Sequence, residues 1–284
     1  MVSRREILQA GSAAALLGAT ARAKQLQSVG VQLYTVRRIL PQKPDETLRA
    51  IEAIGYREVE ATYTGLDKIW PALKATSLKP VSIHLDTSVV LPGKEDELAR
   101  AIDQVKEHGF SYAVYPYVMP AQRGGPDKIK ALAEKLNTIG EKCKAAGLTF
   151  CYHNHAFEFE PMNGTTPFQV MMDTFEKDLV GLEMDCFWVS VAGHDPVQLL
   201  EKLHGRVHLL HLKDKAKGTP VRYNESVPAS TFKEVGNGVI DWPAVLKAAE
   251  PAGVKHFFVE QDATPGDPLD SLRQSYAYIS KLDF

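Results

Sequence analysis

Hydrophobic and polar positions alternate between two patterns along the chain. Short apolar runs predict buried strands, and each run is followed by a stretch in which apolar residues recur every three or four positions, as in an amphipathic helix. The two patterns alternate eight times. The predicted strands are residues 28–33, 57–60, 80–84, 111–115, 148–153, 180–185, 206–211 and 255–260. The predicted helices are residues 45–54, 66–76, 95–108, 126–146, 167–177, 196–203, 242–251 and 268–281.

Proline and glycine mark the ends of several predicted helices. Pro44, Pro126 and Pro243 stand at helix starts, whereas Gly55 and Gly253 follow helix ends. A strand followed by a helix, repeated eight times, is typical of a single-domain (β/α)₈ barrel, an α/β fold. We expect this TIM barrel to occupy residues 24–284.

An open, doubly wound sheet is the main alternative fold. It would have fewer repeats and a glycine-rich phosphate turn after the first strand. The first strand instead runs into residues 30–35 (GVQLYT), which lack that pattern. The longest irregular segment, residues 214–240, follows the seventh strand, and a loop of this length in a compact domain is usually functional.

The first 23 residues predict an export signal. Arg4 and Arg5 precede a short apolar stretch, and residues 21–23 (ARA) offer a small-residue cleavage site. This pattern is typical of a twin-arginine signal, and it places the mature protein in the periplasm or outside the cell. The alternative is an amphipathic N-terminal helix. The apolar stretch is too short to span a membrane.

The amino-acid composition limits the kinds of molecule that the protein is expected to bind. The formal net charge of -2 gives no basic footprint for nucleic acid or for an anionic membrane surface. Cys143, Cys151 and Cys186 show no metal or redox spacing, so we interpret them as small buried residues. The expected partner is therefore a small molecule, and the sequence is also compatible with a homo-oligomer.

Four ionisable residues stand at or just beyond the ends of successive predicted strands: Glu158, Asp185, His211 and Glu260. In a (β/α)₈ barrel these ends converge on one rim. A single strand-end carboxylate is more often a helix N-cap or a surface ion-pair partner, but four such residues together are costly to bury unless they are paired or bind a cation. Their donor atoms suit one divalent ion, Mn²⁺, Mg²⁺, Co²⁺ or Zn²⁺.

Three segments carry a resemblance to a known family: residues 208–214 (HLLHLKD), 236–242 (GNGVIDW) and 152–159 (YHNHAFEF). They resemble motifs of the xylose isomerase-like barrels, a family of sugar-phosphate isomerases and epimerases, inosose dehydratases and ketose 3-epimerases. The resemblance extends over essentially the whole chain after residue 27.

The resemblance implies one divalent metal held by Glu158, Asp185, His211 and Glu260. The chain departs from the family at two places. Many relatives read Glu-Asn-His where this chain has residues 153–155 (HNH), so either Glu158 or His153 supplies the first ligand. Many relatives also carry a substrate-contacting histidine where this chain has Trp188.

Further residues are weaker candidates for substrate binding. These are His84, His153, His155, Trp188 and Lys213. His84 could equally be a buried structural histidine, and Lys213 could equally pair with an acidic neighbour. Glu183 shares a strand face with Asp185, so its carboxylate is predicted to point into the barrel and to need a partner, such as a histidine at the rim. The remaining histidines at helix ends or strand starts are read as structural: His108, His194, His204 and His256.

The resemblance implies proton abstraction beside a carbonyl, with Glu158 and Glu260 sharing acid and base roles on an enediolate. An exported member is expected to act on a free sugar or polyol as an isomerase or epimerase. A lyase or dehydratase acting on keto-sugars or inososes, or eliminating from 3-keto-glycosides, is the alternative. A non-catalytic sugar-binding barrel also stays open, whereas the neutral charge argues against an apurinic-site endonuclease of the same family.

Overall fold

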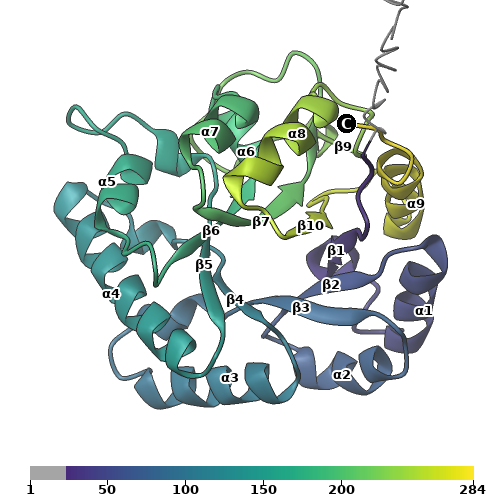
Figure 1. The fold of residues 1–284 in the computed structure, drawn as a ribbon, viewed down its shortest axis with the longest axis horizontal. Coiled ribbons are helices and arrows are strands. Elements are labelled where there is room, and N and C mark those ends of the chain that lie inside the picture. Colours follow the sequence, from purple (N-terminus) through teal and green to yellow (C-terminus); the bar gives the residue numbers. More distant parts are fainter. Residues whose placement is uncertain (1–23) are drawn as a thin grey trace, which may run out of the picture.

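The computed structural model describes residues 24–284, so the predicted export signal in residues 1–23 lies outside the described residues. Eight parallel strands close into a barrel in the order β1-β10-β7-β6-β5-β4-β3-β2, and helices surround it (Figure 1). The predicted single-domain (β/α)₈ barrel is confirmed.

The strands and helices follow the predicted alternation closely. The barrel strands are β1 (Gly30–Gln32), β2 (Glu58–Thr62), β3 (Lys79–His84), β4 (Tyr112–Tyr115), β5 (Thr149–His153), β6 (Gly181–Asp185), β7 (Val207–Leu212) and β10 (His256–Val259). The helices are α1 (Pro44–Ile54), α2 (Leu66–Lys74), α3 (Glu95–Glu107), α4 (Pro126–Ala145), α5 (Pro167–Thr174), α6 (Cys186–Val191), α7 (Pro196–Lys202), α8 (Trp242–Ala252) and α9 (Pro268–Ile279).

Local chemistry explains why these segments become helices. In α3 the buried residues Leu98, Ala101, Ile102 and Val105 recur at helical spacing, and three acidic residues occupy its first turn, where they favour the positive end of the helix dipole. The predicted proline starts are confirmed: Pro44 and Pro126 open α1 and α4, and Pro243 is the second residue of α8.

Two small elements were not predicted. Helix α6 follows β6 directly, because the Asp185 side chain accepts a hydrogen bond from Trp188 N and caps the helix. The long segment after β7 contains a short antiparallel pair, β8 (Asp214–Lys215) with β9 (Phe232–Lys233). The prediction of an irregular segment over residues 214–240 was therefore wrong for these few residues, whose pairing requires contacts between distant positions.

The barrel interior has an apolar layer below a polar one. On β5, β7 and β10 the apolar residues Cys151, Leu209 and Phe258 form part of a buried interior cluster. Two positions further along each chain come His153, His211 and Glu260, because alternate residues of a strand face the same side. The Phe258 ring lies against β1, where a Cβ at Gly30 would meet it at 2.4 Å, so only glycine fits there.

Asp214 fixes the long loop between β7 and α8. Its buried carboxylate accepts hydrogen bonds from the backbone N–H groups of Lys215, Gly236, Gly238 and Ile240, and from Trp242 Nε1. A Cβ at Gly238 would meet Asp214 Oδ1 at 2.1 Å, which explains why glycine stands there. Two of the motifs seen in the sequence thus form one structural cluster, the Asp214 cluster.

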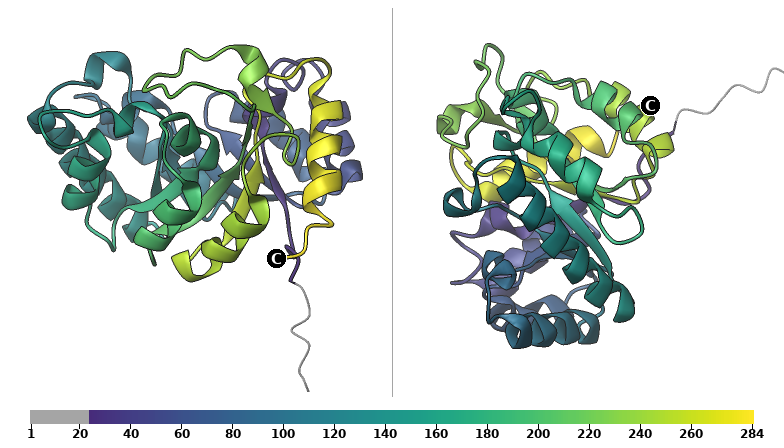
Figure 2. Two further views of the ribbon diagram at one scale, coloured as in Figure 1. Left: turned by 90° about the horizontal axis from the view of Figure 1, so that it is seen from above. Right: turned by 90° about the vertical axis from the view of Figure 1, so that its left-hand side faces the viewer.

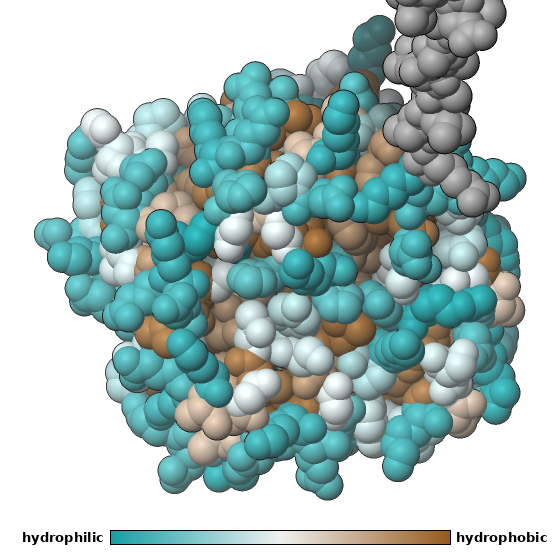
Figure 3. All heavy atoms as spheres, in the orientation of Figure 1, coloured by the Kyte–Doolittle hydropathy of each residue, from teal (hydrophilic) through white to brown (hydrophobic). Residues whose placement is uncertain are grey.

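The two ends of the described chain pair with each other. Lys24 N donates to Phe284 O, and Phe284 N donates to Lys24 O, at 3.1 and 3.0 Å. These residues lie at one end of the barrel, and the green loop between β7 and α8 lies at the other (Figure 2). The face drawn in Figure 3 is covered largely by hydrophilic side chains, with hydrophobic ones scattered between them.

Within residues 24–284, no helix combines the length and apolar composition that crossing a membrane requires. Cys143, Cys151 and Cys186 are all buried and free, as the sequence predicted.

Candidate active site

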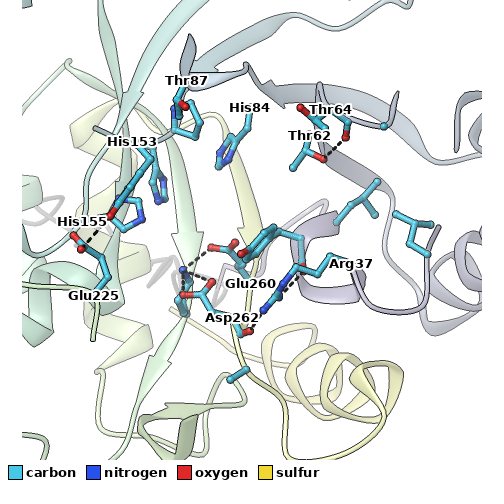
Figure 4. Close-up of a pocket in the computed structure, with 18 of the residues that line it drawn as sticks. Arg37, Thr62, Thr64, His84, Thr87, His153, His155, Glu225, Glu260 and Asp262 are labelled. Carbon is cyan, nitrogen blue, oxygen red and sulfur yellow. Dashed lines mark hydrogen bonds and ion pairs between the residues drawn. The ribbon is translucent and has the colours of Figure 1, made fainter. Parts of the chain in front are cut away.

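A cavity of about 940 Å³ opens at the carboxyl ends of the strands. Of the residues singled out in the sequence, six line it: His84, His153, His155, Trp188, Lys213 and Glu260. Figure 4 shows His84, His153 and His155 on one side of the hollow and Arg37 on the other, with Glu260 and Asp262 between them. The rim rule of barrel enzymes therefore places the predicted substrate-binding residues around one space.

Three of the predicted metal ligands come together beside this cavity. One donor atom each from Asp185, His211 and Glu260 lies within 4.8 Å of the others, and all three residues are buried. His211 Nδ1 is 3.0 Å from Glu260 Oε2 and 3.7 Å from Asp185 Oδ2. Asp185 Oδ1 caps α6, whereas Asp185 Oδ2 faces the ammonium of Lys213.

Lys213 places a buried ammonium against the same carboxylates. Its Nζ is 2.9 Å from Asp185 Oδ2, 2.6 Å from Glu260 Oε2 and 3.2 Å from Asp262 Oδ1. Burial opposes the charge of Lys213, but the three carboxylates outweigh it and raise its pKa well above the usual value. Burial also opposes the ionisation of Glu260, but Lys213 and His211 hold the Glu260 pKa well below its usual value.

A second polar group, the inner cluster, lies deeper in the barrel and consists of Glu60, His84, Glu183 and the inner edge of His211. His84 Nε2 is 2.7 Å from Glu183 Oε2 and 3.2 Å from Glu60 Oε1. His211 Nε2 is 2.6 Å from Glu60 Oε1. The expectation that Glu183 points inward and meets a rim histidine is confirmed. Burial opposes the charge of His84, but Glu60 and Glu183 raise its pKa to about 10.

Glu60 was missed by the sequence reasoning. It accepts hydrogen bonds from Gln32 Nε2 at 2.7 Å and Ser82 Oγ at 2.5 Å, and it is fully buried. The sequence held one signal for it: Glu58 and Glu60 are two positions apart on β2, so both side chains lie on the same, inward face of the strand. Glu58 does not join the site, because its Oε2 pairs with His256 Nδ1 at 2.9 Å.

Glu158 lies outside this constellation. Its Oε1 accepts a hydrogen bond from Tyr152 OH at 2.6 Å, and its Oε2 accepts one from His155 N at 2.9 Å. It belongs to neither group of metal-type donors found among the described residues, and it is not among the residues lining the cavity. Burial raises the Glu158 pKa to about 8. The geometry therefore does not place Glu158 where the family resemblance put the first ligand.

Aromatic side chains form one wall of the cavity. The His155 and Trp188 rings lie 5.4 Å apart, and the Tyr117 ring meets His155 at 4.9 Å. The buried Trp188 Nε1 and His155 Nδ1 have no hydrogen-bond partner. Such a wall offers ring faces for the C–H surface of a sugar and free polar atoms for its hydroxyls.

Two further features were not predicted. Asp262, two residues after Glu260, lines the cavity, and burial raises its pKa to about 6 against the opposing pull of Lys213. Arg123 and Glu225 form an ion pair at 3.1 Å, and Tyr117 OH donates to Glu225, so the loop after β4 is tied to the long loop after β7. A contact between two loops has no local sequence pattern.

The residues present fit a divalent metal. Asp185, His211 and Glu260 supply two carboxylates and an imidazole whose donor atoms lie within 4.8 Å of one another. Buried carboxylates this close repel one another unless cations neutralise them, and the single ammonium of Lys213 faces three of them. The donor set therefore suits one such ion at the floor of the cavity.

Comparisons with known proteins agree with the fold. Residues 48–282 match the family model described as xylose isomerase-like TIM barrel. A curated relative named inosose dehydratase, from Clostridium perfringens, is 27% identical over 162 residues, which is 54% of this chain and 54% of that protein. The chain thus matches about half the length of that relative.

Solved structures extend the likeness over nearly the whole chain. A sugar phosphate isomerase/epimerase from Parabacteroides distasonis superposes with a TM-score of 0.75 at 24% identity, covering 92% of this chain and 94% of that one. A xylose isomerase-like TIM barrel protein from Mycobacterium smegmatis, solved in complex with magnesium, gives a TM-score of 0.66 at 14% identity over 89% of this chain and 95% of that one. At these identities the likeness shows the fold alone.

Proposed function

Because this chain belongs to the xylose isomerase-like TIM barrel family, we propose that it is a metal-dependent enzyme that removes a proton next to a carbonyl group of a free sugar or polyol. The expected overall reaction is isomerisation or epimerisation. The observation that carries the proposal is the convergence of Asp185, His211 and Glu260 at the floor of a cavity with polar and aromatic walls.

Asp185, His211 and Glu260 would hold a divalent ion whose positive charge would stabilise the negative charge that develops on the carbonyl oxygen. Glu260 faces the cavity in its ionised form, and we assign it the proton transfer at carbon. Asp262 also faces the cavity, and its pKa of about 6 suits a group that both takes and gives a proton near neutral pH. We therefore assign the second acid–base role to Asp262. Glu158 is given a supporting role, since it accepts a hydrogen bond from the backbone of His155 in the cavity wall.

The cationic groups of the cavity favour an unphosphorylated substrate. Among the lining residues, Arg37 donates to Tyr34 O and Asp262 O, and Lys213 is held by three carboxylates. Lys68 lines the cavity too, but it is exposed. A phosphate dianion normally requires several convergent donors. This arrangement supports a free sugar, as does the export signal proposed from residues 1–23.

Dehydration of a keto-sugar or inosose is a second candidate reaction. It is favoured by the similarity to inosose dehydratase, although that similarity covers only about half of each chain. Both reactions begin with removal of the same proton, and the fate of the resulting enediolate separates them. Elimination additionally needs a proton donor for the departing oxygen, a role open to Asp262.

The proposal is tested by incubating the metal-loaded protein in D₂O with ketohexoses, inososes and 3-keto-glycosides. An isomerase or epimerase will incorporate deuterium at the carbon next to the carbonyl and give a new saturated sugar. A dehydratase or lyase will give an unsaturated product that absorbs ultraviolet light. Absence of both exchange and product with every metal and substrate would leave a sugar-binding barrel without catalysis, and the proposal would be wrong.

A further inference from the structure

We infer that the metal ion is held by two histidines and two carboxylates, His153, Asp185, His211 and Glu260, and that Glu60 and Glu183 act behind the histidines as positioning residues. The inference rests on the metal requirement of the proposed function. It concerns a choice that the sequence left open, whether Glu158 or His153 supplies the first ligand.

His211 presents its two ring nitrogens to two different groups. Nε2 lies 2.6 Å from Glu60 Oε1, and Nδ1 faces Glu260 Oε2 at 3.0 Å and Asp185 Oδ2 at 3.7 Å. With an ion bound, a proton held on Nε2 by the Glu60 carboxylate would leave the Nδ1 lone pair free for that ion, in place of the hydrogen bond that now joins Nδ1 to Glu260. In metal sites, a carboxylate that accepts the N–H of one ring nitrogen of a ligand histidine fixes its tautomer, so that the other nitrogen binds the metal.

His153 repeats this arrangement from the neighbouring part of the barrel. Its Nδ1 is 3.1 Å from Glu183 Oε2, and its Nε2 is on the side of Asp185, 3.9 Å from Asp185 Oδ2. The Nδ1 contact lacks the angle of a hydrogen bond, and it marks Glu183 as the only carboxylate within ion-pair reach of this nitrogen among the described residues.

His84 completes the inner cluster. It touches both Glu60 and Glu183 and itself lines the cavity. Two buried carboxylates side by side would repel each other strongly, and one imidazolium between them balances part of their charge. His84 therefore pairs with Glu60 and Glu183, which position the ligand histidines, and we do not assign it as a metal ligand.

A second group of metal-type donors overlaps the inner cluster, since His84, His153, Glu183 and His211 offer atoms within 4.8 Å of one another. Hydrogen-bond distances already join His84 to Glu183 and His211 to Glu60. The outer group of Asp185, His211 and Glu260 reaches the cavity through Glu260, and His153 Nε2 faces it at 3.9 Å from Asp185 Oδ2. An ion held there would compete with Lys213 for the two carboxylates but would leave the contacts of Glu60 and Glu183 with the histidines in place.

This ligand set has a consequence for metal choice. Two imidazole nitrogens favour Zn²⁺ or Co²⁺, whereas an all-oxygen environment suits Mg²⁺. Replacing a glutamate ligand by His153 therefore moves the site away from Mg²⁺, even though many carboxylates surround it.

The test is a metal titration of the metal-free full chain, without sugar, using calorimetry for Mg²⁺, visible absorption for Co²⁺ and a competing chelator for Zn²⁺. We expect one equivalent of Co²⁺ or Zn²⁺ to bind far more tightly than Mg²⁺. His153→Ala should weaken Co²⁺ binding by at least about 100-fold and change its absorption spectrum, while Glu60→Gln and Glu183→Gln should each weaken binding by about 10–100-fold.

Glu158→Gln is the matched control, because it alters a buried carboxylate just beyond the same strand without touching the proposed site. We expect it to bind Co²⁺ like the wild type. His153→Glu guards against misfolding of the alanine variant: it should keep a ligand and shift the affinity ratio toward Mg²⁺ by at least about tenfold.

Three results would overturn the inference: loss of Co²⁺ binding in Glu158→Gln with wild-type binding in His153→Ala, two equivalents of metal in the wild type, or Mg²⁺ preferred over Co²⁺ and Zn²⁺. Since no sugar is present, these outcomes are separate from those of the D₂O assay. A protein that binds metal as expected but exchanges no proton would contradict the proposed function alone.

Discussion

Two buried carboxylate clusters stand next to each other at the end of β7, and they differ in how their oxygens are satisfied. Asp214 accepts five hydrogen bonds, four from backbone N–H groups and one from Trp242. Asp185 and Glu260, which contact Lys213 one residue before Asp214, are surrounded by charged groups instead. Asp185 Oδ2 there is paired with the Lys213 ammonium, and in the adjoining inner cluster Glu183 Oε1 has no hydrogen-bond partner.

The difference separates a structural role from a chemical one. Neutral donors that fill every acceptor position hold a carboxylate in place and leave it nothing further to bind. Charged neighbours and unfilled acceptor positions cost stability, and they persist where the missing partner is a ligand or a reacting group. The following experiments change one cluster at a time.

The largest effect is expected from Glu260→Gln. Loss of the base should lower kcat by about 10²–10⁴-fold, while the protein still folds because Lys213 keeps Asp185 and Asp262 as partners. Turnover and circular dichroism measure the two effects. Glu58→Gln, at the other end of the barrel, is the matched control and should keep its activity. Wild-type turnover in Glu260→Gln would remove this residue from the mechanism.

Asp214→Ala should produce the opposite profile. Several buried donors lose their acceptor at once, so we expect the free energy of unfolding to fall by about 3–4 kcal/mol. Denaturant titration measures this loss. The folded fraction at low temperature should still bind Co²⁺ with nearly wild-type affinity. Unchanged stability would show that water replaces the carboxylate and that the Asp214 cluster is not what holds the loop.

Metal removal tests directly whether the group of Asp185, His211 and Glu260 binds an ion. A metal at 100 times its Kd stabilises the folded state by about 2.7 kcal/mol, which corresponds to a rise of about 5–10 °C in Tm for a protein of this size. Thermal unfolding with and without chelator should show this difference in the wild type. Asp185→Asn should show little of it. A Tm that changes neither with chelator nor with added metal would mean that the carboxylates bind no ion.

A further effect, that of Glu158→Gln, is read as a pH dependence. Burial raises the Glu158 pKa from 4.5 to about 8, so folding takes up a proton between these values and its contribution to stability is lost as the pH rises through about 8. The variant carries no such charge. Its Tm relative to wild type should therefore rise from pH 5 to pH 8 and then level off. A constant difference would contradict the buried, protonated state.

The sequence predicted the fold well because periodicity is a local signal. Each strand was found within a few residues, since an apolar run followed by an amphipathic stretch with proline or glycine at its ends needs no distant information. Helix α6 was missed because its start depends on the Asp185 side chain. The β8–β9 pair was missed because sixteen residues separate its two strands along the chain.

The site was predictable only in part. The strand-end rule brought Asp185, His211 and Glu260 together, but it cannot tell which way a residue in the following turn points. Glu158 comes after β5 has ended, in a short 3₁₀ turn (Phe157–Phe159), and there it meets Tyr152 instead of the cavity. Glu60 and Asp262 gain their importance from partners on other strands, which no spacing along the chain reveals.

The pairing of Lys24 with Phe284 has a practical consequence. Because the ends of residues 24–284 are joined at the barrel end remote from the cavity, a peptide linker could connect them, and new termini could be opened in an exposed loop elsewhere. An affinity tag attached at Phe284 would anchor the molecule to a surface with its cavity facing the solution. Calorimetric or optical titrations could then be repeated on immobilised protein.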